Sequence, residues 1–244
     1  MRVTVIGFWG AYPAAEGATS CYLFEQDDFR LLVDCGSGGM SRLQKYIDPF
    51  QLDAVLISHY HQDHIADVGV LQYAWLVQNT LQDTNKKLSI YGHPFDTAKF
   101  NSLSHQYTEG KAYDPSETLS IGPFTVKFQE TNHPVPCYGM AVSNGKHQVV
   151  YTADTSFSEA WIPFAEGADL LITDTNFYKG MDGTGPGHMT SEEAGALANK
   201  ARVRELLLSH LPHFGEHDQL IKEAKERYEG LVSLAEEGWT WESQ

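Results

Sequence analysis

The chain has few cysteines and no long apolar run. Its three cysteines, Cys21, Cys35 and Cys137, are too few for a disulfide framework and follow no zinc-ribbon spacing. We therefore expect buried thiols in a reducing compartment, which predicts a cytoplasmic location. No apolar run approaches the ~18 residues of a membrane-spanning helix, and the first residues alternate like a strand rather than a signal peptide. No membrane partner is expected.

Basic residues are also scarce. The chain carries 17 Lys and Arg against 32 Asp and Glu, a formal net charge of −15. The densest basic group, Lys200, Arg202 and Arg204, is short, whereas proteins that grip a long nucleic acid usually carry a basic stripe. The charge disfavours a long nucleic-acid partner and leaves a small phosphate ester open.

No linker or low-complexity segment divides the sequence. The 244 residues, 42% of them hydrophobic, fit one α/β domain, since such domains often reach ~250 residues. The glycine-rich segment 180–187 (GMDGTGPG) is too short for a boundary and predicts a loop. We therefore predict a single domain over residues 1–244.

Apolar runs and periodicity predict mixed secondary structure. Thr190 to Glu193 (T-S-E-E) has the form of a capping box and predicts the start of a helix. Expected strands cover residues 3–8, 21–25, 30–33, 54–57, 88–91, 124–128, 140–143, 148–151, 170–173 and 205–208. Expected helices cover residues 41–47, 66–81, 191–201 and 217–228, with a hairpin through 236–238. This mixture predicts an α/β fold of sheets covered by helices on their outer faces.

Four short apolar runs each end at a residue that can bind a metal. AVLIS is followed by His59, VVYTA by Asp154, LLIT by Asp174 and LLLS by His210. Continuous apolar runs are typical of strands buried on both faces, and sites in layered α/β folds collect at the carboxyl ends of such strands. These four side chains could therefore face one cleft.

The string His-Tyr-His-Gln-Asp-His at residues 59–64 is the sharpest motif. In extended chain, residues two apart point the same way, so His59 and His61 can share one ion. Asp63 and His64 diverge as a helix begins and suit a second ion. The resulting hypothesis places His59, His61 and His133 on one ion, Asp63, His64 and His210 on the other, and Asp154 between them. Imidazole and carboxylate ligands favour two Zn ions, with Mn or Fe as alternatives.

These residues resemble the signature of the metallo-β-lactamase superfamily over nearly the whole chain, and most closely its ribonuclease Z and cyclic-phosphodiesterase branch. The resemblance rests on VIGFWGAYP, LLVDCGSG, NHPVPCYGMAV, YTADTSFSEAW, ADLLITDTNF, GHMTSEEAGALA, LSHLPH and YEGLVSLAEEGWTWE. It implies a four-layer αββα sandwich with a two-zinc site at its edge, and a homodimer. Asp rather than Cys at position 154 separates the chain from true β-lactamases of this fold.

Two departures from the ribonuclease Z pattern limit what can be carried over. A basic arm usually lies between the third histidine and the bridging aspartate, but here only 20 residues separate His133 from Asp154. Two strands and the turn Asn144-Gly145 fill them, so the arm is absent. The branch's Glu-Ala-Thr-Phe is replaced by Asp174-Thr175-Asn176-Phe177, a shorter carboxylate whose role the sequence leaves open.

The catalytic candidates are Asp63 and His188. Two metal ions can hold a shared hydroxide that attacks phosphorus and can neutralise the developing charge. Asp63 could bind metal and also orient or deprotonate that water, as the resemblance implies. His188 lies in GHMTSEEAGALA, the branch's extra histidine motif, and could stabilise the phosphoryl charge or protonate the leaving oxygen.

The sequence supports one leading function and leaves three others open. The leading hypothesis is a zinc-dependent phosphodiesterase whose metal-bridging hydroxide attacks a small or short phosphodiester. The alternatives are a tRNA 3′-processing endoribonuclease, a lactone or thioester hydrolase, and a metal-retaining ligand-binding module without turnover.

Overall fold

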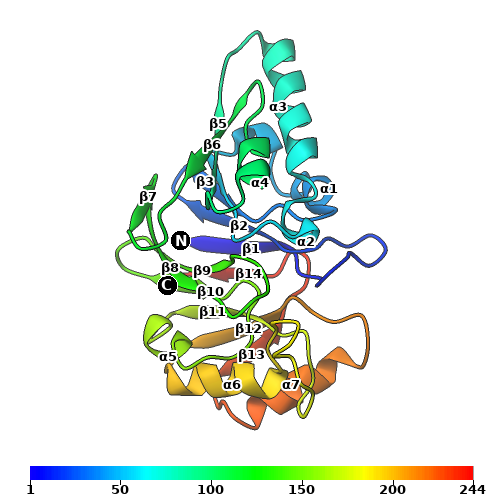
Figure 1. Ribbon diagram of the computed structural model, residues 1–244, viewed down its shortest axis with the longest axis vertical. Helices are drawn as coiled ribbons and strands as arrows, with labels where there is room; N and C mark the ends of the chain where they lie inside the picture. Colours follow the sequence, from blue (N-terminus) through cyan, green and yellow to red (C-terminus); the bar gives the residue numbers. More distant parts are fainter. Residues whose placement is uncertain (244) are drawn as a thin grey trace. The chain divides into compact units, whose positions relative to one another are not determined.

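The computed structural model describes residues 1–243 and divides into two compact units, each built on one seven-stranded sheet (Figure 1). The first unit holds residues 1–114 and 237–242, and the second holds residues 115–236 with Ser243. The prediction of a single domain over residues 1–244 stays a prediction. Among residues 1–243, no helix is both long enough and apolar enough to cross a membrane.

The sheet of the first unit is mixed. Its strands, in spatial order, are β14 (Thr240–Glu242), β1 (Arg2–Gly7), β2 (Cys21–Gln26), β3 (Phe29–Val33), β4 (Ala54–Leu56), β5 (Leu88–Gly92) and β6 (Thr108–Ala112). Pairing is antiparallel from β14 to β3 and parallel from β3 to β6. The unit also holds α1 (Gly39–Leu43), the 3-10 helix η1 (Pro49–Gln51), α2 (Gln62–Ile65), α3 (Val68–Gln82) and α4 (Thr97–Ser102).

Helix α3 supplies the largest side chain of the first unit's core. Leu71 and Trp75 are fully buried on its inner face. The Trp75 indole N–H donates to the carbonyl of Pro49 (3.3 Å), and its ring lies 4.7 Å from that of Phe50. A buried Trp needs such a partner for its one donor. The packing explains why an uncharged helix forms here even though its outer face exposes Tyr73 and Leu81.

The sheet of the second unit is also mixed. Its strands, in spatial order, are β13 (Leu231–Leu234), β12 (Glu205–Ser209), β11 (Leu170–Asp174), β10 (Gln148–Tyr151), β9 (Tyr138–Ser143), β8 (Phe124–Glu130) and β7 (Leu119–Ile121). The strands from β10 to β13 are parallel, and those from β7 to β10 are antiparallel. Helices α5 (Trp161–Phe164), α6 (Ser191–Lys200) and α7 (His217–Lys225) belong to this unit, and α6 and α7 lie side by side (Figure 1).

Several sequence predictions are confirmed locally. Thr190 caps α6, its side chain accepting from the Glu193 amide while the Glu193 carboxylate accepts from the Thr190 amide. In β8, Phe124 and Val126 are buried and the intervening Thr125 is exposed, as the alternation predicts. All three cysteines are buried and form no disulfide among residues 1–243.

The predicted hairpin through residues 236–238 is wrong. β13 pairs in parallel with β12, whereas β14 pairs antiparallel with β1, so the two strands belong to different sheets. The partner of β14 lies near the other end of the described chain, and local turn signals carry no information about such a pairing. The sequence predicts none of the short elements η1, α2, α4, α5, β6 and β7. The helix expected over residues 41–47 covers Gly39–Leu43 instead.

The parallel strands of the second unit end at one edge of its sheet. Tyr151 of β10 is level with Ile172 of β11, and Asp174 at the end of β11 is level with Ser209 of β12. Two residues just past these ends, Ala153 and His210, adopt positive φ values of 51° and 52°. Such angles are uncommon outside glycine and cluster at functional sites.

Two helical glycines provide a test of the packing. A Cβ on Gly195 of α6 would lie 2.3 Å from the backbone oxygen of Ala224, whereas one on Gly69 of α3 would meet nothing within 4 Å. We expect Gly195→Ala to lower the free energy of unfolding by about 1–3 kcal/mol through overpacking. Gly69→Ala should raise it by about 0.5 kcal/mol. Denaturant titration checks both, and equal effects of the two substitutions would contradict the close approach of α6 to α7.

Candidate functional site

The first unit gathers four potential ligands immediately after β4. His59 and His64 are fully buried and Asp63 is 8% exposed. The His59 ring lies 4.8 Å from the His61 ring and 4.1 Å from the His64 ring, and His64 Nε2 lies 3.7 Å from Asp63 Oδ2. The structure therefore brings together all four residues that the motif singled out.

The local backbone explains this grouping. His61 is extended (φ −67°, ψ 152°) and is the N-cap of α2. The amide of His64 then donates to the carbonyl of His61 (3.0 Å), which closes the first helical turn. This turn carries the His64 ring back toward His59. An extended residue followed by one helical turn is what groups the four side chains.

Asp34, at the end of β3, holds the His64 ring. Its carboxylate is fully buried and lies 2.7 Å from His64 Nδ1. It also accepts from the amide and the hydroxyl of Ser58, both at 2.8 Å, and that hydroxyl lies 3.0 Å from His59 Nδ1. Since the Nδ1 atoms of both rings are engaged in this way, their Nε2 atoms are the ones left to face a metal. A carboxylate behind a ligating histidine fixes its tautomer and orientation.

The sequence reasoning did not assign Asp34. The available signal was an aspartate directly after the buried run of β3, inside LLVDCGSG. The adjoining glycine turn is needed for a close approach, because a Cβ on Gly36 would lie 2.0 Å from the backbone oxygen of Asp63. A different segment, between β1 and β2, positions the Asp63 side chain, whose Oδ2 accepts from the Ala11 amide (2.9 Å).

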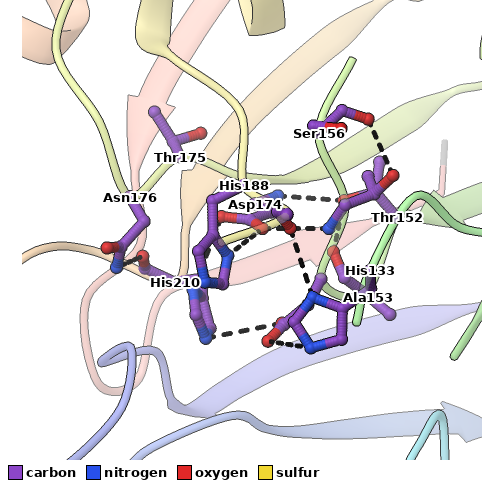
Figure 2. A network of polar contacts seen from close by, with 12 residues as sticks. His133, Thr152, Ala153, Ser156, Asp174, Thr175, Asn176, His188 and His210 are labelled. Atoms are coloured by element: carbon purple, nitrogen blue, oxygen red, sulfur yellow. Dashed lines mark hydrogen bonds and ion pairs between the residues drawn. The ribbon is translucent and has the colours of Figure 1, made fainter. Parts of the chain in front are cut away.

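The second unit forms its own cluster at the carboxyl ends of its parallel strands (Figure 2). The two oxygens of Asp154 face different histidines, with Oδ2 3.9 Å from His133 Nε2 and Oδ1 3.4 Å from His210 Nε2. The 3.9 Å separation is too long for a hydrogen bond, and 3.4 Å is at the outer limit. Two ligands at ~2.0–2.1 Å from one tetrahedral ion lie roughly 3.3–3.4 Å apart, so the spacing suits metal binding.

His133 is held in the orientation that this requires. Its side chain is 2% exposed, and its Nδ1 lies 3.3 Å from the carbonyl oxygen of Gly187. A carbonyl only accepts, so Nδ1 carries the proton and Nε2 presents its lone pair toward Asp154. Gly187 has φ 80°, and a Cβ there would lie 2.9 Å from His133 Nδ1. The glycine-rich loop therefore reaches the ring closely because residue 187 has no side chain.

Asp174, whose role the sequence left open, supports two histidines. Its Oδ2 lies 2.7 Å from His188 Nδ1 and accepts from the Thr155 amide (3.0 Å), while its Oδ1 lies 3.4 Å from His210 Nδ1. Figure 2 shows His188 and His210 converging on this carboxylate. The shortened side chain thus reaches both rings from the end of β11.

His188 is positioned by this pair. Its ring stacks on that of His210, with centroids 5.0 Å apart. Burial lowers the pKa of His188, but the charge of Asp174 and its hydrogen bond outweigh burial, so the pKa of His188 is raised above its usual value. His188 is therefore suited to carry a proton close to the Asp154 cluster.

The donor chemistry of both clusters fits metal ions. Each offers imidazole nitrogens held by a partner at the opposite ring nitrogen, and carboxylate oxygens from Asp63 or Asp154. Such nitrogen and oxygen sets suit Zn and related divalent ions. The structure thus presents histidine and aspartate clusters that could hold metal.

Comparison with known proteins agrees with this geometry. The family described as "Beta-lactamase superfamily domain" matches residues 29–211. The chain is 52% identical over 243 residues to the Bacillus subtilis strain 168 protein "Probable metallo-hydrolase YhfI", covering 99% of this chain and 100% of the relative. A crystal structure of the metallo-β-lactamase fold protein YhfI from Bacillus subtilis superposes with a TM-score of 0.98 over 99% of each chain.

A more distant relative carries a more specific name. The chain is 27% identical to a ribonuclease Z of Haloferax volcanii, over 98% of this chain and 93% of the relative. The matches confirm the predicted fold class and the predicted class of metal-dependent hydrolase. The chain belongs to the β-lactamase superfamily domain family, in the metallo-hydrolase branch whose relatives include ribonuclease Z.

Proposed function

We propose that the protein is a binuclear zinc phosphodiesterase that hydrolyses a small or short phosphodiester, with Mn or Fe as alternative metals. The observation that carries the proposal is the Asp154 carboxylate, whose two oxygens each face a different histidine Nε2. A carboxylate presented in this way suits a bridge between two ions, since each oxygen can serve one ion beside its own histidine.

The seven potential ligands are enough for two ions. A zinc ion in a catalytic site takes at least three protein ligands, so two ions with one bridging carboxylate need about five or more. The first unit offers four donor residues and the second offers three. We assign His59, His61 and His133 to one ion, Asp63, His64 and His210 to the other, and Asp154 to both.

The chain's own residues would divide the remaining work. When bound, two zinc ions supply Lewis acidity and activate water at neutral pH. Asp63 would orient the attacking water besides serving as a ligand. His188, kept protonated by Asp174, would donate its proton from Nε2 to the leaving oxygen. Asp34 and Asp174 would hold the histidine rings during the reaction.

Two features favour a small phosphodiester over a long RNA. The alignment with the Haloferax ribonuclease Z runs over 301 residues although this chain has 244, so the relative carries insertions that this chain lacks. The net charge of −15 also opposes the approach of a long polyanion. The ribonuclease Z relative itself supports phosphodiester rather than carbonyl chemistry.

One preparation tests the proposal. Metal content by mass spectrometry should give two zinc ions per chain, and the loaded protein should cleave bis(p-nitrophenyl) phosphate or a cyclic nucleotide. Cleavage of pre-tRNA with a steep salt dependence would instead favour tRNA processing. Hydrolysis of lactones or thioesters alone would favour carbonyl chemistry. Stoichiometric ligand binding without turnover would favour a ligand-binding module. Sedimentation of the same sample tests the homodimer that the resemblance implies.

His61→Ala tests the ligand assignment. We expect the substitution to remove metal and hydrolysis together, because it deletes one of the three nitrogen ligands of an ion. Metal content and the rate with bis(p-nitrophenyl) phosphate are the measurements. His105→Ala, on an exposed histidine, is the matched control and should leave both unchanged. Retained turnover in His61→Ala would contradict the assignment.

Asp34→Asn tests the carboxylate behind His64. An amide cannot accept from Ser58 and His64 as the carboxylate does, so we expect metal affinity to fall by about 10–100-fold. Competition with a chelator measures this without relying on activity. Asp28→Asn, on an exposed aspartate, should keep wild-type affinity. Wild-type affinity in Asp34→Asn as well would show that Asp34 does not orient a ligand.

His188→Ala tests the proton donor. With an alkoxide leaving group we expect kcat to fall by about 100-fold or more, because the leaving oxygen needs a proton. With p-nitrophenolate, which leaves without protonation, the loss should be much smaller. Steady-state kinetics on both substrate types measures the two losses. The control is His213→Ala, on an exposed histidine. An equal loss on both would indicate charge stabilisation in place of proton donation.

A further inference from the structure

A hollow in the second unit, here called the aromatic pocket, lies apart from the ligand residues. It has a volume of about 460 Å³ and is lined by Tyr178, Met181, Phe214, Gly215, Glu216 and Gln219. Met181 and Phe214 are 43% and 46% exposed, which is high for large apolar side chains. None of these residues takes part in the proposed chemistry. Exposed apolar side chains gathered in a hollow are typical of a ligand site.

The walls of this aromatic pocket are fixed in place. The Tyr178 hydroxyl donates to the carbonyl of Phe214 (3.0 Å), and the two rings lie 5.8 Å apart. Gly215 has φ 74°, and a Cβ there would lie 2.5 Å from the Tyr178 ring. The Tyr178 ring can rest against the chain only because residue 215 has no side chain. The pocket is therefore preformed around two aromatic faces.

One ring connects the aromatic pocket to the proposed proton donor. The centroid of Phe177 lies 6.1 Å from that of His188 and 6.4 Å from that of Phe214. Two backbone hydrogen bonds hold Phe177 beside the segment that follows His188: its amide donates to the carbonyl of Met189, and its carbonyl accepts from the amide of Ser191. The half-buried ring of Phe177 thus forms a fixed apolar surface between His188 and Phe214. A substituent on a phosphate-ester oxygen near His188 can extend along this apolar surface.

The electrostatics of the aromatic pocket select against the phosphate itself. Burial raises the pKa of Tyr178, and the carboxylates of Glu223 and Glu216 raise it further, so the phenol stays neutral. Glu216 also lines the pocket and repels an anion. An uncharged flat ring is the chemistry that fits, because it can stack on Phe214 and Tyr178 while its phosphate stays beside His188.

We propose that the aromatic pocket binds a flat aromatic ring, an aryl group or a nucleobase, carried by the phosphate ester that the metal centre holds. The inference rests on the proposed phosphodiesterase function and deepens it, since it restricts the substrate class to esters with an aromatic substituent. Stacking supplies the selectivity and tolerates different rings, because every such ring has a π-face.

Binding of two small phosphate esters to the zinc-loaded protein tests the pocket without turnover. Phenyl phosphate and methyl phosphate share the phosphate and differ in the ring. By calorimetry we expect phenyl phosphate to bind about 10-fold more tightly, a factor within the range of one stacking contact. Phe214→Ala should reduce this preference to about 2-fold or less and leave methyl phosphate unchanged. Phe214→Trp should keep the preference because it retains a ring.

The control is Phe95→Ala, which removes an exposed phenylalanine of the first unit and should change neither affinity. An unchanged preference in Phe214→Ala, or no preference in the wild type, overturns the pocket. Thermal melting of each variant excludes unfolding as the cause. A ring preference that depends on Phe214 in a protein that cleaves no phosphodiester would uphold the pocket and overturn the hydrolase proposal. Phosphodiester cleavage without that preference would do the reverse.

Discussion

The histidine clusters depend on acceptors that hold the ring nitrogen facing away from the cluster. Asp34 engages His64, Asp174 engages His188 and lies 3.4 Å from Nδ1 of His210, and the carbonyl of Gly187 engages His133. Each contact is made at Nδ1, which leaves Nε2 for a metal or a proton. An imidazole alone can rotate and can change its tautomer, so it would present no defined lone pair. These contacts convert loose side chains into a donor set with fixed directions.

The backbone is shaped to make these contacts possible. Asp34, Ala153 and His210 follow buried strands and adopt positive φ values of 57°, 51° and 52°. These conformations are unfavourable for residues with a Cβ, so the surrounding sheets must hold them. Close approaches at Gly36 and Gly187 leave no room for a side chain. The strands are stable enough to support strained ends, and the potential ligands are placed at or beside those ends.

In the proposed function, the second unit would hold both the reacting phosphate and the aromatic substituent of the substrate. Asp154, His210 and His188 lie at the strand ends, and Phe177 leads from His188 to the aromatic pocket. A phosphate ester with an aromatic substituent would contact both features at once. The acidic surface of the chain would then affect which substrates approach, while zinc would make the reaction centre locally positive. The net charge of −15 thus becomes compatible with phosphate chemistry on small substrates.

The sequence by itself determined most of the strands, the longer helices, the capping box at Thr190 and the identity of the potential ligands. These properties follow from periodicity and from residue types a few positions apart, which are local. Only the tertiary structure decided that β13 and β14 join different sheets, that Asp34 lies behind His64, and that Phe177, Tyr178 and Phe214 line one path. Asp34 and His64 are 30 residues apart, and Tyr178 and Phe214 are 36 apart. No local pattern encodes such pairs, because they meet only when the sheets form.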